Sequence, residues 1–161
     1  MDFLNPIALL VAAISALIIA LIWYNPKVFG SIWMKEANLT PADIKSTNML
    51  KIFVLAFIFA FLLAMTMMQF TIHQTGALSL IGGDSSKALP SYTAFMLDYG
   101  THFRSFKHGA LHGVMAAIFV ALPILGTHAI FERKSAKYIF INSGYWLVTL
   151  AVMGAIICGW Q

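Results

Sequence analysis

Long stretches without charge dominate the pattern of polar and apolar positions along this chain. No Asp, Glu, Lys or Arg lies within residues 3–26, 52–83, 108–131 or 138–161. Each stretch exceeds the roughly 20 residues with which a helix crosses a hydrocarbon core about 30 Å thick. Helices of soluble proteins carry a polar face opposite the apolar one. The pattern therefore predicts four transmembrane helices.

The expected spans are about 5–24, 49–75, 108–131 and 138–160. We predict one all-α transmembrane domain over residues 1–161, in which the spans form an antiparallel bundle. Pro6 suits the first turn of a helix, Pro26 ends the first span, and Pro123 should kink the third. The short link 132–137 makes the third and fourth spans a helical hairpin.

Short interfacial helices are expected in the longer connections. Residues 29–35 combine two aromatic side chains with a lysine, which indicates an amphipathic piece lying in the membrane interface. Thr40 is a helix N-cap and Pro41 a first helical residue, so a helix begins there and can run into the second span. In the second connection, 82–86 is a turn sequence and 92–106 can form a surface helix.

Composition and charge agree with a membrane protein. The chain is 60% hydrophobic and 10% charged, against about 25% charged residues in ordinary soluble domains. The basic residues lie at the ends of spans, which favours a lipid bilayer over nucleic acid as the partner. Seven of the ten lie in the first and third connections: Lys27, Lys35, Lys45, Lys51, Arg133, Lys134 and Lys137. This bias predicts a multi-pass protein of the cell membrane, most simply the bacterial cytoplasmic membrane, with extracytoplasmic termini.

Small residues recur every four positions in all four spans. Four-residue spacing places a row on one helix face, and in lipid small residues allow helices to approach closely. The rows are Ala8, Ala12, Ala16 and Ala20; Ala56, Ala60 and Ala64; Gly109, Gly113, Ala117 and Ala121; and Ala151, Ala155 and Gly159. We expect a tight bundle built on these rows. A row of small residues that does not pack within one chain could pack against a second copy of the chain. A homo-oligomer or membrane complex is therefore expected.

Four histidines lie near the outer ends of the second and third spans. His108 and His112 are one helical turn apart, so one face of the third span can present two imidazoles to one metal ion. His73 and His102 are candidates for further ligands. The cluster is therefore a possible metal site of the membrane protein.

Two interpretations of these histidines stay open at this stage. Met65, Met68 and Met115 could approach from a similar depth, and a mixed histidine and methionine set favours Cu(I). Copper or zinc would then be the cofactor. The alternative is that His108 marks the interface and His112 hydrogen-bonds across helices. No cofactor is expected in that case.

Other chemistry is sparse in this sequence. His128 and Glu132 are one turn apart at the inner end of the third span, which predicts a salt bridge. No carboxylate lies inside a span, which argues against a proton-coupled carrier. Three function classes remain: a non-enzymatic accessory or self-associating membrane component, a channel or transporter with a pore at an oligomer axis, and a metal-dependent membrane enzyme. We favour the first.

Three local sequences carry a family resemblance. They read Trp-Tyr-Asn-Pro-Lys-Val-Phe-Gly-Ser-Ile-Trp over residues 23–33, Gly-Ala-Leu-His-Gly over 109–113 and Ile-Asn-Ser-Gly-Tyr over 141–145. With these motifs the chain resembles the bacterial and fungal membrane proteins grouped as domain of unknown function 1761. The resemblance covers nearly the whole chain. It implies four spans and no particular activity.

The first of these motifs also has a physical interpretation as an interfacial clamp. Its aromatic side chains belong to the types that favour the headgroup region. Proline should end the first span, and glycine should let the chain turn back. The clamp residues are Trp23, Tyr24, Pro26, Phe29, Gly30 and Trp33.

Overall fold

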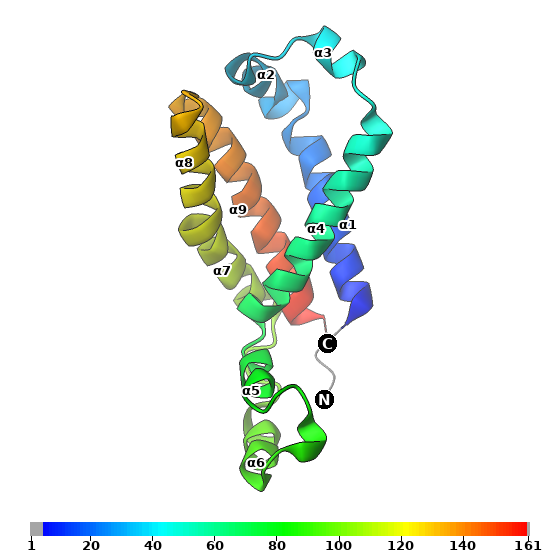
Figure 1. Ribbon diagram of the computed structural model, residues 1–161, viewed down its shortest axis with the longest axis vertical. Helices are drawn as coiled ribbons and strands as arrows, with labels where there is room; N and C mark the ends of the chain where they lie inside the picture. Colours follow the sequence, from blue (N-terminus) through cyan, green and yellow to red (C-terminus); the bar gives the residue numbers. More distant parts are fainter. Residues whose placement is uncertain (1–4, 161) are drawn as a thin grey trace.

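The computed structural model describes residues 5–160, in which every element is helical (Figure 1). The elements are α1 Pro6–Trp23, η1 Pro26–Gly30, α2 Ser31–Ala37, α3 Pro41–Lys45, α4 Met49–Thr71, α5 Gln74–Leu80, η2 Ser85–Lys87, α6 Pro90–Tyr99, α7 Phe106–Ala116, η3 Ala117–Ala121, α8 Leu122–Phe131 and α9 Ala136–Gly159. Four helices are long and apolar enough to cross a membrane: α1, α4, the continuous Phe106–Phe131 and α9. The all-helical class and the four candidate spans are therefore confirmed.

Side-chain caps fix where the long helices begin. The side-chain oxygen of Asn5 accepts from the Ala8 N–H at 3.0 Å, with Pro6 in the first turn. Asn48 caps α4 in the same way, and Ser105 and Ser135 cap α7 and α9. Each cap satisfies a backbone donor that the first helical turn leaves free.

Two predicted helix boundaries are wrong. The second span was expected to reach residue 75, but α4 ends at Thr71 because Ile72 has extended backbone angles and a buried side chain. The helix at Pro41 does not continue into the second span, because it ends at Lys45 and Asn48 caps a new helix. A third boundary differs as well, because the surface helix expected at 92–106 is α6, which begins at Pro90 and ends at Tyr99.

At Pro123, where a kink is expected, the helix contains a π-helical turn, η3, that ends just before the proline. Proline has no N–H, so the helix loses one backbone hydrogen bond there. The chain forms η3 just before it, where the Leu122 N–H donates to the Ala117 carbonyl five residues back. Single π turns of this kind are a known cause of irregular helices.

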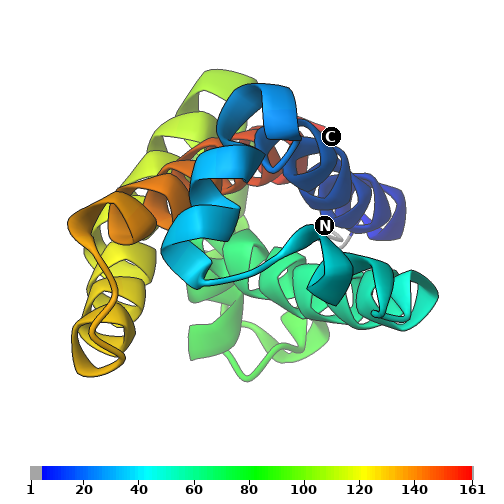
Figure 2. The same cartoon turned by 90° about the horizontal axis from the view of Figure 1, so that it is seen from above.

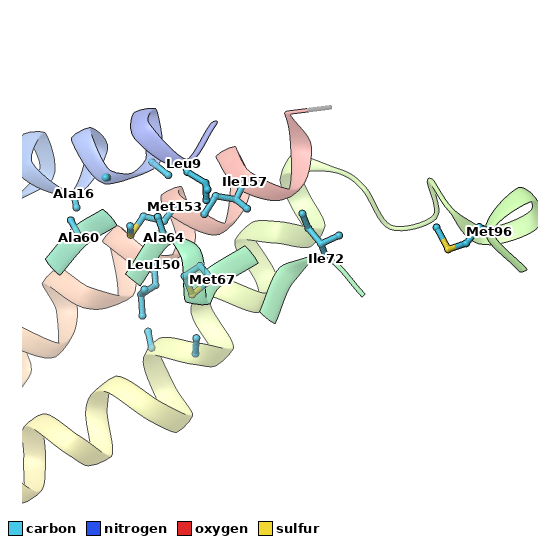
Figure 3. Close-up of a cluster of buried hydrophobic side chains, with 14 residues drawn as sticks. Leu9, Ala16, Ala60, Ala64, Met67, Ile72, Met96, Leu150, Met153 and Ile157 are labelled. Atoms are coloured by element: carbon cyan, nitrogen blue, oxygen red, sulfur yellow. The ribbon is translucent and has the colours of Figure 1, made fainter. Parts of the chain in front are cut away.

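The helix α9 is the centre of the fold, since it contacts α1, α4, α7 and α8. Figure 2 shows the long helices crossing one another, and Figure 1 shows α8 diverging from α4 toward the end that carries α2 and α3. The buried cluster joins small residues of α1 and α4 to large ones of α9 (Figure 3), among them Ala12, Ala16, Ala60, Ala64, Leu150, Met153 and Ile157.

The closest approach in the fold is between α7 and α9. A Cβ added at Gly109 would clash with the Gly154 carbonyl oxygen, and one added at Gly154 would clash with that of Gly109. A Cβ at Gly113 would clash with the Leu150 carbonyl oxygen. We call this contact the glycine seam. Gly154 belongs to none of the predicted four-residue rows, so the sequence pattern identified one side of the seam and missed its partner.

The remaining predicted packing residues continue along the same span. Ala117 is buried and Ala121 is half-buried against the core. In α9, Gly159 of the predicted row lies against the Phe106 ring and backbone rather than against another small residue. The seam is equally tight at Gly113, where α9 offers the backbone of Leu150 and Ala151 rather than a glycine.

Replacing Gly113 with alanine should destabilise the fold, because the new methyl group meets backbone that has no room to move. Overpacking typically costs about 1–3 kcal/mol. Gly126→Ala is the matched control in the same span, because a Cβ there meets nothing within 4 Å. Helix propensity alone should make the control more stable by up to about 1 kcal/mol. Melting temperatures in detergent that move in the same direction for both variants would contradict the seam.

Candidate functional site

The segment α5–α6 projects beyond the four long helices, and both of its ends return to one end of the bundle (Figure 1). It enters at His73, just after α4, and leaves before α7. The side-chain amide of Gln74 holds entry and exit together, because it donates to the carbonyls of Tyr99 at 2.8 Å and His102 at 2.9 Å. The chain therefore brings two segments far apart in sequence to one place.

The end of α9 anchors both of these segments. The buried Cys158 thiol lies 3.3 Å from the carbonyl oxygens of Thr71 and Phe103 and can donate to either. The Arg104 Nε donates to the Cys158 carbonyl at 3.1 Å. Burial lowers the pKa of the Arg104 guanidinium, and the nearby Cys158 opposes that shift. No role for Cys158 follows from the sequence, because a lone cysteine carries no signal of its contacts.

Three histidines meet at this anchored end. One ring nitrogen each of His73, His108 and His112 lies within 4.8 Å of the others. The Nε2 atoms of His73 and His108 are 3.0 Å apart, and the rings of His108 and His112 are 4.4 Å apart. His73 is exposed and the other two are half-buried. We call these three residues the histidine cluster.

The geometry of the histidine cluster fits a transition-metal ion. Tetrahedral zinc binds imidazole nitrogen at about 2.0–2.1 Å, which separates two ligand nitrogens by roughly 3.4 Å. The 3.0 Å and 4.8 Å separations in the cluster bracket this value, so small side-chain rotations can provide three ligands. Imidazole suits zinc, copper(II) and nickel. Three ligands leave one coordination position for another molecule.

The other predicted ligands do not join this group. His102 lies with its ring 5.3 Å from that of Tyr99, and the described metal-ligating group does not include it. Met68 packs against the hydrophobic core, while Met65 and Met115 are exposed. Among the histidine, cysteine and carboxylate side chains of residues 5–160, the group that could hold a metal ion is therefore these three histidines.

Phe103 is a residue of the site that sequence reasoning missed. Its ring lies 5.1 Å from the ring of His108 and 6.2 Å from that of His73. Its φ of 62° is in the left-handed region, which a bulky side chain rarely adopts. Such backbone strain is held by surrounding contacts and is frequent at functional sites. The Cys158 thiol beside the Phe103 carbonyl is one of those contacts.

A cavity of about 220 Å³ adjoins the cluster. Its walls come from the start of α5, from α6 and from the segment that follows α6. The lining residues are His73, Gln74, Phe95, Tyr99, His102 and Phe103. The cavity and the histidine cluster thus share His73.

The salt bridge expected between His128 and Glu132 is wrong. Within residues 5–160 the ion pair is Lys87 with Asp84, 3.1 Å apart in the second connection. At the end of the molecule that carries α2 and α3, the first and third connections instead bond to each other. The Ser135 hydroxyl donates to the Glu36 carboxylate, and the Lys134 ammonium donates to the Ala37 carbonyl at 3.4 Å. Polar partners on the neighbouring connection replace the expected intrahelical pair.

At this same end, the aromatic residues of the predicted clamp contact α9. The Trp23 indole N–H donates to the Ile141 carbonyl at 3.1 Å, and the Tyr24 hydroxyl donates to the Asn142 side chain at 2.8 Å. The ring of Trp23 lies 4.6 Å from that of Phe29, and the ring of Tyr24 lies 5.0 Å from that of Trp33. Two of the three family-like motifs therefore pack on each other across 118 positions of sequence.

The glycines of these two motifs serve close approach. Gly30 has right-handed helical backbone with a φ of −59°, so its conformation is one that any residue can adopt. Its hydrogen is required because a Cβ would clash with the Tyr24 carbonyl. A Cβ at Gly144 would lie 2.9 Å from the Trp23 ring. Pro26, as expected, follows the end of the first long helix and begins η1.

Burial and the nearby Tyr145 and Tyr138 raise the pKa of Tyr24 above its ordinary value. Its hydroxyl therefore stays protonated and available as a donor to Asn142.

These features define a class: an all-helical chain with four apolar helices suited to a multi-pass membrane protein and a histidine cluster at one end. The chain belongs to the family described as Protein of unknown function (DUF1761), whose model matches residues 7–158. The resemblance inferred from the motifs is thereby confirmed. Neither the curated proteins nor the solved structures contain a match.

Removing the Tyr24 hydroxyl should loosen the clamp. Tyr24→Phe deletes the donor to Asn142 and leaves that amide oxygen without its partner, which should cost about 1 kcal/mol. Tyr92→Phe, in the partly buried α6, is the control and should change stability little. Unfolding in detergent, followed by circular dichroism, measures both. A stability loss no greater for Tyr24→Phe than for the control would show that the bond contributes nothing.

Proposed function

We propose that this protein spans the cell membrane as an antiparallel bundle of four helices. The outward faces of the long helices support this, because large apolar side chains such as Leu50, Phe119 and Phe140 are more than 70% exposed. Exposed apolar surface of this extent needs a cover. The four apolar helices are 18 to 26 residues long, which matches the thickness of the hydrocarbon core of a bilayer. We therefore expect lipid to surround these exposed side chains. Successive connections at alternate ends of the bundle agree with antiparallel spans (Figure 1).

The bias of basic residues supports an orientation with extracytoplasmic termini. The first and third connections lie at one end of the molecule and carry seven of its ten lysine and arginine residues (Figure 1). By the positive-inside rule that end would be cytoplasmic, in bacteria the inner face of the cytoplasmic membrane. The histidine cluster would then lie at the extracytoplasmic face.

Cysteine labelling tests this orientation. Ser85→Cys in the second connection should react with an impermeant thiol reagent on intact cells, and Ala136→Cys should react only after lysis. Both positions are exposed, and the native Cys158 is fully buried. Gly83 is avoided because its φ of 82° would strain a side chain. If Ala136→Cys is labelled on intact cells and Ser85→Cys is not, the termini are cytoplasmic and the proposed orientation is wrong.

We propose further that the protein is a membrane component that binds a divalent metal ion, of the zinc or copper(II) type, through His73, His108 and His112. The observation that carries this proposal is the meeting of three imidazoles from two different segments at one point. One segment is the fixed end of α4 and the other is the first two turns of α7. Both are held by α9 through Cys158 and the glycine seam. Catalytic zinc sites also have three protein ligands and one open position. Metal binding therefore supports the metal-dependent enzyme class as well as a non-enzymatic component.

The channel or transporter alternative receives less support. The cleft between α4, α8 and α9 has a volume of about 280 Å³ and is lined by apolar side chains, with Thr66 as its polar exception. Such a lining offers ions no ligands in place of their hydration shell. A pore at an oligomer axis, and the homo-oligomer itself, remain predictions. Most small-residue rows are occupied inside the chain, so an oligomer would have to use other faces.

Metal content of the purified protein tests the metal proposal. The wild type, loaded with zinc and freed of excess, should retain one ion per chain. His73→Gln, His108→Gln and His112→Gln should each weaken zinc binding by more than the roughly 10- to 100-fold typical of losing a supporting contact. His128→Gln at the other end and His102→Gln near the cavity are the controls and should retain the ion. Zinc retained by all variants, or by none including the wild type, would refute the site.

A further inference from the structure

We propose that the fourth coordination position of this metal centre takes the carboxylate of a small aromatic acid, whose ring occupies the cavity beside the cluster. The inference rests on the proposed metal binding and names the class of ligand. Three features carry it: the cavity shares a side chain with the metal ligands, its walls suit a ring, and the charge of the centre calls for an anion.

The shared side chains make the cavity and the cluster neighbours. His73 belongs to the histidine cluster and also lines the cavity. Phe103 lines the cavity too, and its ring lies 5.1 Å from that of His108. A molecule in the cavity can therefore contact His73, one of the three ligands.

The walls of the cavity are mostly aromatic. The rings of Phe95 and Tyr99 lie 5.2 Å apart, those of Tyr99 and His102 lie 5.3 Å apart, and Phe103 completes the set. Aromatic pairs at such distances favour a further ring over an alkyl group of the same area. The volume of about 220 Å³ is sufficient, since an apolar cavity of about 150 Å³ holds benzene. One substituted ring fits.

Charge selects the head group of the ligand. Three neutral imidazoles cancel none of the charge of a divalent ion, and the described ligating group contains no carboxylate. Partial burial of His108 and His112 makes a net double positive charge costly. A carboxylate reduces that charge by one and is an ordinary ligand of zinc. The ligand class that combines both demands is an aromatic monocarboxylate.

Cobalt(II) in place of zinc makes this ligand visible, because its absorption bands change when the fourth ligand changes. The full-length protein in lipid nanodiscs, loaded with cobalt, is titrated with 4-methylbenzoate and separately with acetate. The two probes share the carboxylate and differ in the ring. We expect 4-methylbenzoate to act at a concentration at least tenfold lower than acetate. Because the bands report coordination, partition of the probe into lipid does not count as binding.

Variants locate the ring in the cavity. Phe95→Ala removes part of the wall, and Phe95→Trp fills part of the space. In both variants the ratio of the acetate concentration to the 4-methylbenzoate concentration that changes the cobalt bands should fall close to one. Leu80→Ala, on the same projecting segment but 90% exposed, is the control and should keep the preference. Unchanged cobalt bands without added acid show that a variant retains an intact centre.

The outcomes separate this inference from the proposal on which it rests. If the wild type binds no cobalt or zinc, the metal proposal fails and the inference fails with it. If cobalt binds and the two acids act at equal concentrations, the metal proposal stands and the inference is overturned. A preference that survives both Phe95 variants also overturns it, since the ring would then lie elsewhere.

Discussion

The backbone contact between α7 and α9 at Gly109 and Gly154 is the constraint on which most of this structure depends. Apolar helices in lipid gain little from burying apolar surface, so association requires close approach of the helix backbones. Glycine on both sides allows it here. Gly154 also lies close to Thr71, since a Cβ there would be 3.3 Å from the threonine methyl group. One residue of α9 thus positions the start of α7 and the end of α4 together.

The histidine cluster follows from that positioning. His108 lies one residue before Gly109, and His112 lies one residue before Gly113, so the glycine seam fixes their common face relative to α9. His73 comes two residues after Thr71, which the Cys158 thiol contacts. The same thiol contacts the carbonyl of Phe103, whose left-handed backbone places its ring beside two of the histidines. The cluster is therefore built on the most tightly packed part of the molecule.

The opposite end of the molecule uses different chemistry for the same purpose. There α1 and α9 are joined by indole and phenol donors, and aromatic rings fill the space between the motifs. Sequence reasoning identified the clamp residues. It could not identify α9 as their partner, because a local motif does not specify which distant segment it contacts. Gly30 illustrates the limit: glycine was expected for its backbone freedom, and the structure shows that it is needed because the Tyr24 carbonyl lies against it.

The sequence by itself determined the number of helices long and apolar enough to cross a membrane, the helical class and most helix starts, because hydropathy and N-caps act within a few residues of the chain. It also placed His108 and His112 on one face. Only the tertiary structure decided that His73 joins them, across 35 positions and the whole α5–α6 segment, and that His102 does not. It alone paired Gly109 with Gly154. Such choices depend on which backbones approach most closely, which is a property of two segments at once.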